Sequence, residues 1–132
     1  MGKYEVKAFP LYHEKHFWVR KMPDGMYKIG VTDYAQSKQG SIVYADLPSE
    51  GDTITKDETY GSVESSKAVS DLIAPVSGTV AAVNEEVLDS PGIINDSCYD
   101  SGWLIAVEPS DWEGESAELM NADAYTEYLD TL

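Results

Sequence analysis

The sequence from Thr59 to Ile73 reads TYGSVESSKAVSDLI. Apolar and polar residues alternate over residues 59–64 and again over residues 69–73, which is typical of β-strands that bury one face. The segment between the two runs consists of small residues apart from Lys67, as tight turns often do. The pattern therefore predicts a β-hairpin that carries Lys67 near its tip.

Two acidic residues flank this lysine. Glu64 lies three residues before Lys67 and Asp71 four residues after it, so a hairpin would hold both carboxylates near one amine. The simpler interpretation is an exposed lysine between two acids, which stabilises a fold by less than about 1 kcal/mol. The other interpretation is that the carboxylates serve a chemical role of the lysine, and the spacing alone leaves both open.

Short strand patterns continue on both sides of the hairpin. The turn sequence Met-Pro-Asp-Gly at residues 22–25 predicts a second hairpin, whereas residues 33–38 lack strand alternation and are predicted as a helical turn. A weak repeat relates residues 51–58 to residues 78–85 and predicts two similar half-sheets that face each other. The other predicted strands are residues 17–20, 27–31, 41–45 and 103–107.

The pattern takes on a helical period near the C-terminus. Ser110 and Glu113 have the spacing of a capping box, which predicts the start of a helix. The apolar face of a C-terminal helix is predicted from residues at i, i+3, i+4 and i+7, namely Tyr125, Tyr128, Leu129 and Leu132. We therefore expect a mainly β fold with short helices and a C-terminal helix, in one domain over residues 1–132.

Composition narrows the classes of partner and the compartment. The formal net charge of −15 repels phosphate backbones and anionic membrane surfaces, so we expect neither nucleic acid nor membrane as a partner. Cys98 is the single cysteine, which forbids an intramolecular disulfide and favours a reducing compartment. Residues 1–7 lack the hydrophobic stretch of a signal peptide, and the sequence predicts a cytoplasmic protein.

Motifs for metal and nucleotide chemistry are weak. His13 and His16 are the only histidines, and no cysteine cluster completes a ligand set, so we expect no metal site and interpret His16 as packed beside Trp18. The glycine-rich fingerprints that cradle phosphates are absent from the sequence.

Residues 63–72 closely resemble the modification site of glycine cleavage system H proteins, whose pattern is Val-Glu-Ser-Val-Lys-Ala-Val-Ser-Asp. The resemblance spans nearly the whole chain in order. It includes residues 16–19, 29–36, 40–48, 73–80, 83–84, 91–95 and 102–104. This family implies the barrel-sandwich fold of lipoyl and biotinyl carriers.

The resemblance implies that Lys67 carries lipoic acid through an amide bond, attached by a lipoate ligase or lipoyl transferase. It further implies that the chain shuttles an aminomethyl group between glycine decarboxylase, aminomethyltransferase and dihydrolipoyl dehydrogenase, and catalyses none of these steps itself. We expect a monomer when the chain is free. The same resemblance assigns Glu64 and Asp71 to recognition by the ligase or to docking of the arm.

The chain departs from the family at two positions of the expected groove for the arm. Phe17 stands where the family commonly has Glu, and Tyr34 where some members have His, which leaves Asp71 as the familiar carboxylate. Two alternatives stay open: a lipoate relay protein of the same fold, and an unmodified acidic module that binds a basic partner. Biotin carriers fit less well, because Ser66 and Ala68 flank Lys67 in place of their typical methionines. Lipoyl domains of oxo-acid dehydrogenases typically show Asp-Lys-Ala within a much longer chain, and they also fit less well.

Overall fold

The structure is a computed structural model that describes residues 4–8 and 10–132, so Met1–Lys3 of the N-terminal segment considered above lie outside the described residues. Its strands are β1 (Leu11–His13), β2 (Phe17–Lys21), β3 (Tyr27–Val31), β4 (Ile42–Asp46), β5 (Thr53–Ile54), β6 (Thr59–Ser65), β7 (Val69–Ile73), β8 (Gly78–Val83) and β9 (Ile105–Pro109). Its helices are α1 (Asp33–Gln39), α2 (Glu85–Asp89), α3 (Ile93–Asp96), α4 (Trp112–Ser116) and α5 (Ala122–Asp130).

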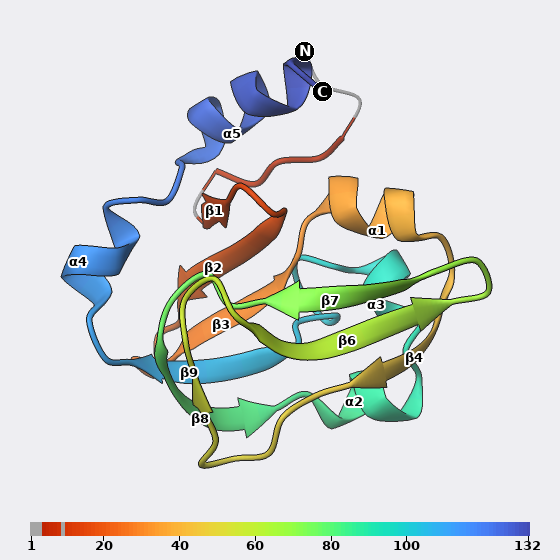
Figure 1. Cartoon of the computed structure of the whole chain (residues 1–132), viewed down its shortest axis with the longest axis horizontal. Coiled ribbons are helices and arrows are strands. Elements are labelled where there is room, and N and C mark those ends of the chain that lie inside the picture. Colours follow the sequence, from red (N-terminus) through yellow and green to blue (C-terminus); the bar gives the residue numbers. More distant parts are fainter. Residues whose placement is uncertain (1–3, 9) are drawn as a thin grey trace.

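The strands form two antiparallel sheets (Figure 1). One sheet has six strands in the order β1-β2-β3-β9-β8-β5, and the other has three in the order β4-β6-β7. The mainly β class with short helices and a C-terminal helix is thus confirmed. Within the described residues the two sheets pack as separate layers and do not close into one barrel.

The predicted hairpins are confirmed. In the first of them along the chain, the amide of Gly25 donates to the carbonyl of Met22 at 2.9 Å, and Gly25 has a φ of 89°. Glycine adopts such a positive φ at no steric cost, so the Pro-Asp-Gly turn can join β2 to β3 tightly. The second hairpin, β6–β7, extends to one side of the molecule next to α1 (Figure 1).

The repeated segments lie side by side in one sheet, so the prediction of two facing half-sheets was wrong. Thr53 pairs with Thr79 and Ile54 with Gly78, which makes β5 the edge neighbour of β8. Pairing within one sheet gives hydrogen-bond partners to the backbone N–H and C=O groups of both copies. It also places Ile54 in the same buried cluster as Val80.

The C-terminal helices differ from the prediction at their ends. Asp111 caps α4, because its side chain accepts a hydrogen bond from the amide of Gly114, so Ser110 is not the cap. In α5 the side chains of Tyr125 and Leu129 are buried as predicted. Leu132 is 59% exposed, since the helix ends at Asp130 before the apolar face can reach it.

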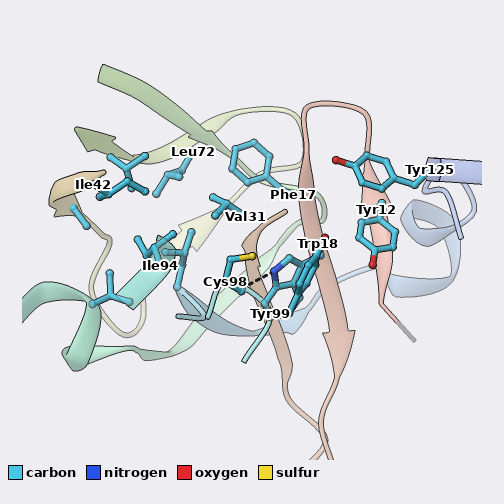
Figure 2. Close-up of a cluster of buried hydrophobic side chains, with 14 of the residues drawn as sticks. Tyr12, Phe17, Trp18, Val31, Ile42, Leu72, Ile94, Cys98, Tyr99 and Tyr125 are labelled. Atoms are coloured by element: carbon cyan, nitrogen blue, oxygen red, sulfur yellow. Dashed lines mark hydrogen bonds between the residues drawn. The ribbon is translucent and has the colours of Figure 1, made fainter. Parts of the chain in front are cut away.

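The larger of two buried clusters combines side chains from both sheets with those of Cys98 and Tyr99, and it includes Trp18 (Figure 2). The indole of Trp18 lies against Gly30, its cross-strand partner, where an added Cβ would be 2.6 Å from the ring. Its Nε1 donates to the carbonyl oxygen of Cys98 at 3.0 Å. Burial raises the pKa of the Cys98 thiol to about 12, which keeps the group protonated.

Candidate functional site

The hairpin tip presents Lys67 to solvent. Ser66, Lys67 and Ala68 are exposed, and the amide of Ser65 donates to the carbonyl of Ala68 at 2.8 Å to close the turn. The hydroxyl of Ser65 accepts from the amides of Lys67 and Ala68 at 3.3 Å and 3.2 Å. The turn therefore holds the backbone of Lys67 by its own hydrogen bonds, while the side chain stays exposed.

The stem of Lys67 lies against the C-terminal end of α1. Gly40, which follows α1, has a φ of 83°, and a Cβ placed there would lie 3.1 Å from Cε of Lys67. A glycine at this position allows both the left-handed backbone and the close approach of the lysine. Lys67 therefore lies beside the C-terminal end of α1.

A cavity of about 360 Å³ lies beside this hairpin. Buried apolar side chains from both sheets form its floor, namely Phe17, Val31, Ile42, Val63 and Leu72. Polar and aromatic residues border it, among them Lys15, His16, Tyr34, Lys38 and Asp71. We call this cavity the apolar groove. Its floor excludes water from one side of any chain that lies along it.

The predicted site residues divide between the groove and the outer face of the hairpin. Phe17, which is 5% exposed, Tyr34 and Asp71 all line the groove, whereas Glu64 does not. Strand register pairs Glu64 with Val69 and Asp71 with Ser62, so the two carboxylates share the outward face of this sheet. Asp71 still borders the groove, because β7 is an edge strand.

The two acids that flank Lys67 in the sequence make no ion pair with it in the structure. Across residues 4–8 and 10–132, no ion pair joins Lys67 to Glu64 or Asp71. Spacing along a hairpin fixes only which residues share a face, whereas the direction of the long lysine stem depends on what packs beside it. Here the stem follows Gly40 instead.

Aromatic rings pack around His16, which borders the groove. Its Nδ1 lies 2.8 Å from the hydroxyl of Tyr125, which is itself 2.8 Å from Oγ1 of Thr32. The imidazole packs on Tyr34 with ring centroids 4.3 Å apart. The sequence placed His16 beside Trp18, but its ring contacts in the structure are tyrosines contributed by α1 and α5.

Burial gives His16 a pH-dependent effect on stability. Desolvation, helped by the nearby charges of His13 and Lys15, lowers the pKa of His16 from 6.5 to about 4. The unfolded chain therefore binds more protons between these two values, and stability rises with pH across that window. Full stabilisation is present above about pH 6.5 and is lost as pH falls through about 4.

We expect His16→Gln to flatten the dependence of unfolding free energy on pH between 4 and 6.5, the pKa range of His16. Because the imidazole is only half-buried, solvent screens part of this effect, and we expect a difference of about 1–2 kcal/mol between the two ends of the window. Urea unfolding at several pH values, wild type against variant, measures this. Parallel curves across the window would contradict the assignment.

His13 has a structural role. Its Nε2 donates to Oδ1 of Asp57 at 2.6 Å, while its Nδ1 accepts from the amide of Lys15 at 2.9 Å. The first bond joins the end of β1 to the loop before β6, and the second stays within the β1–β2 turn. In the part of the chain that the structure describes, no group of three or more potential ligands could hold a metal ion.

Gln39 is the site residue that the sequence pattern missed. It ends α1, is 7% exposed, and contacts the hairpin through its amide group. A single polar residue at the end of a short helix carries no periodic signal, so only the fold reveals its position.

Among the helices of residues 4–8 and 10–132, none has the length and the hydrophobicity of a membrane span.

Comparison with known proteins supports one family. The family model described as glycine cleavage H-protein matches residues 10–132. A probable glycine cleavage system H protein of Pyrococcus furiosus is 45% identical over 132 residues, covering 100% of this chain and 98% of that protein. The glycine cleavage system H protein of Halalkalibacterium halodurans is 51% identical over 118 residues, covering 89% and 91%.

A solved structure agrees with these sequence relatives. The crystal structure of a glycine cleavage system H protein from Mycobacterium marinum has a TM-score of 0.85 and 35% identity, and covers 96% of this chain and 100% of that one. The likeness thus spans both sheets, the hairpin that carries Lys67 and the helices around the groove. The chain belongs to the glycine cleavage H-protein family.

Proposed function

We propose that this chain is the lipoyl carrier of a glycine cleavage system, with lipoic acid bound as an amide to Lys67. The H protein is a carrier component of that system, and the sequence relatives support this role. The observation that carries the assignment to Lys67 is its position: an exposed lysine at a hairpin tip, next to an apolar groove.

The residues around Lys67 fit a covalently attached arm. Ser66 and Ala68 are small and exposed, so a modifying enzyme can approach the amine from the tip. Lysine suits acylation, because its ammonium loses a proton to give a nucleophilic amine, whereas a guanidinium stays protonated. The groove offers an apolar surface within the same region of the fold.

When bound, lipoic acid supplies a dithiolane that accepts an aminomethyl unit together with two electrons. The chain supplies position and shelter. We propose that Phe17 and Tyr34 offer an apolar and aromatic surface to the arm, and that Asp71 offers the carboxylate of the groove to a cationic group. A tether of this kind raises the effective concentration of the carried group at each partner.

The proposed partners are glycine decarboxylase, aminomethyltransferase and dihydrolipoyl dehydrogenase, together with a lipoate ligase or lipoyl transferase. The net charge of −15 favours docking on basic surfaces of these enzymes. We further propose that residues 1–132 form a single carrier domain that works as a monomer in the cytoplasm, where its one cysteine would stay reduced.

The test of attachment is the intact mass of the purified chain before and after incubation with a lipoate ligase, lipoic acid and ATP. We expect a gain of one lipoyl group, and fragmentation of the peptide that contains Lys67 should place it on that residue. A chain that stays at its original mass, although the ligase modifies a known acceptor in parallel, would overturn the assignment.

A second measurement separates glycine cleavage from lipoate relay. The lipoylated chain should support exchange of labelled bicarbonate into the carboxyl group of glycine when a glycine decarboxylase is present, and the unmodified chain should not. The unmodified chain is the control for background exchange. Full lipoylation without exchange would instead favour the relay function.

A further inference from the structure

Gln39 connects α1 to both strands of the hairpin that carries Lys67. Its Nε2 donates to the carbonyl of Ala68 at 2.9 Å and lies 3.4 Å from the carbonyl of Val63. Its Oε1 accepts a hydrogen bond from the hydroxyl of Ser70. Both ends of this amide are therefore satisfied by hairpin atoms, and we call these contacts the Gln39 latch.

The helix that carries Gln39 is itself anchored to neighbouring elements. Asn95 donates to the carbonyl of Gly40 and to Oε1 of Gln36, both at 2.9 Å, and accepts from the amide of Ile42 at 2.8 Å. At the other end of α1, Oγ1 of Thr32 caps the helix and lies 2.8 Å from the hydroxyl of Tyr125 in α5. Because α1 is held at both ends, a bond from Gln39 to the hairpin constrains the hairpin more than the helix.

The hairpin tip has few other restraints. Pairing with β4 holds the hairpin only as far as Ser65, which lies opposite Ile42. Residues 66–69 beyond it are exposed, and the turn bonds made by Ser65 hold this loop together without tying it to another element. β7 is an edge strand, so its outer edge has no neighbouring strand. Gln39 bonds to Ala68, the residue directly after Lys67, and therefore restrains the exposed tip itself.

We propose that Gln39 is a positioning residue for the modification of Lys67, which fastens the hairpin tip to α1 in the arrangement that a modifying enzyme recognises. This inference rests on the proposed function. Gln39 does not contact the reacting amine. It sets the fraction of molecules in which the tip, with Lys67 beside Gly40, has the geometry of the structure.

The energetics follow from the burial of the amide. Gln39→Leu keeps a similar volume but removes the donor and acceptor, which leaves the hydroxyl of Ser70 and the carbonyl of Ala68 without this partner. The tip then samples other positions. When only part of the population is competent to bind, the apparent affinity falls by that fraction while the bound complex reacts as before.

We therefore expect Gln39→Leu to raise the KM of a lipoate ligase for this chain by about three- to tenfold, with kcat little changed. Ser37→Ala is the matched control, because Ser37 is an exposed residue of the same helix that does not border the groove, and it should leave both constants unaltered. An unchanged KM, or a fall in kcat at constant KM, would overturn the proposal.

Hydrogen exchange gives a readout that does not need the arm. In Gln39→Leu the amide of Ser65, which bonds to Ala68, should exchange about three- to tenfold faster. The amide of Val19 in the central sheet should keep its rate and so report intact folding. Unchanged exchange at Ser65 refutes the latch itself, whereas failure of the wild-type chain to become lipoylated refutes the proposed function alone.

Discussion

Lys67→Arg should remain folded and never gain a lipoyl group. The side chain is exposed at a turn, and the bonds that shape this turn come from the backbone and from Ser65, so arginine replaces it without disturbing the core. The guanidinium stays protonated and cannot form the amide. Intact mass after treatment with a lipoate ligase should therefore show no increment, a complete loss relative to wild type.

The control for this experiment is Lys21→Arg, a conservative change at an exposed lysine at the end of β2. This variant should gain the full lipoyl increment. A thermal midpoint near that of wild type would show that Lys67→Arg is folded. If Lys67→Arg still gained the increment, another amine would be the attachment site, and the role of the hairpin tip would have to be abandoned.

Trp18→Ala should cost about 3–5 kcal/mol of unfolding free energy. The indole is 1% exposed, lies against Gly30 and donates to the carbonyl of Cys98, so its removal leaves a cavity and an unpaired buried carbonyl. Urea unfolding followed by circular dichroism measures this as a lower midpoint. The loss is a large part of the total stability of a small protein.

Val43→Ala is the matched control for Trp18→Ala. Val43 lies in β4 but is 64% exposed, so its truncation removes little buried surface and should change the free energy by less than about 0.5 kcal/mol. A loss below about 1 kcal/mol for Trp18→Ala would mean that the cluster around this residue does not support the fold as described.

Much of the β architecture could be predicted, because the signals are local. The Pro-Asp-Gly turn at Met22–Gly25 and the alternation within Thr59–Ile73 specify hairpins through φ preferences and the period of two along a strand. The repeat between residues 51–58 and 78–85 could be recognised in the sequence, but the pairing of its two copies within one sheet could not be predicted. Periodicity identifies a strand and its buried face, and says nothing about which strand lies beside it.

The candidate site divides in the same way. Phe17 and Tyr34 were recognised through resemblance to a family, and the structure places both at the groove. The contact between His16 and Tyr125 joins residues 109 positions apart, and no pattern within either segment predicts it. Gln39 was missed for the same reason.

By itself the sequence determined that a lysine would stand at the tip of a hairpin, because strand alternation and turn chemistry act over a few neighbouring residues. Only the tertiary structure decided what surrounds that lysine. The apolar groove combines side chains from both sheets and α1, and the Gln39 latch joins a helix end to strands more than 20 positions away. Such contacts depend on how the layers pack, which the short-range order of residues does not encode.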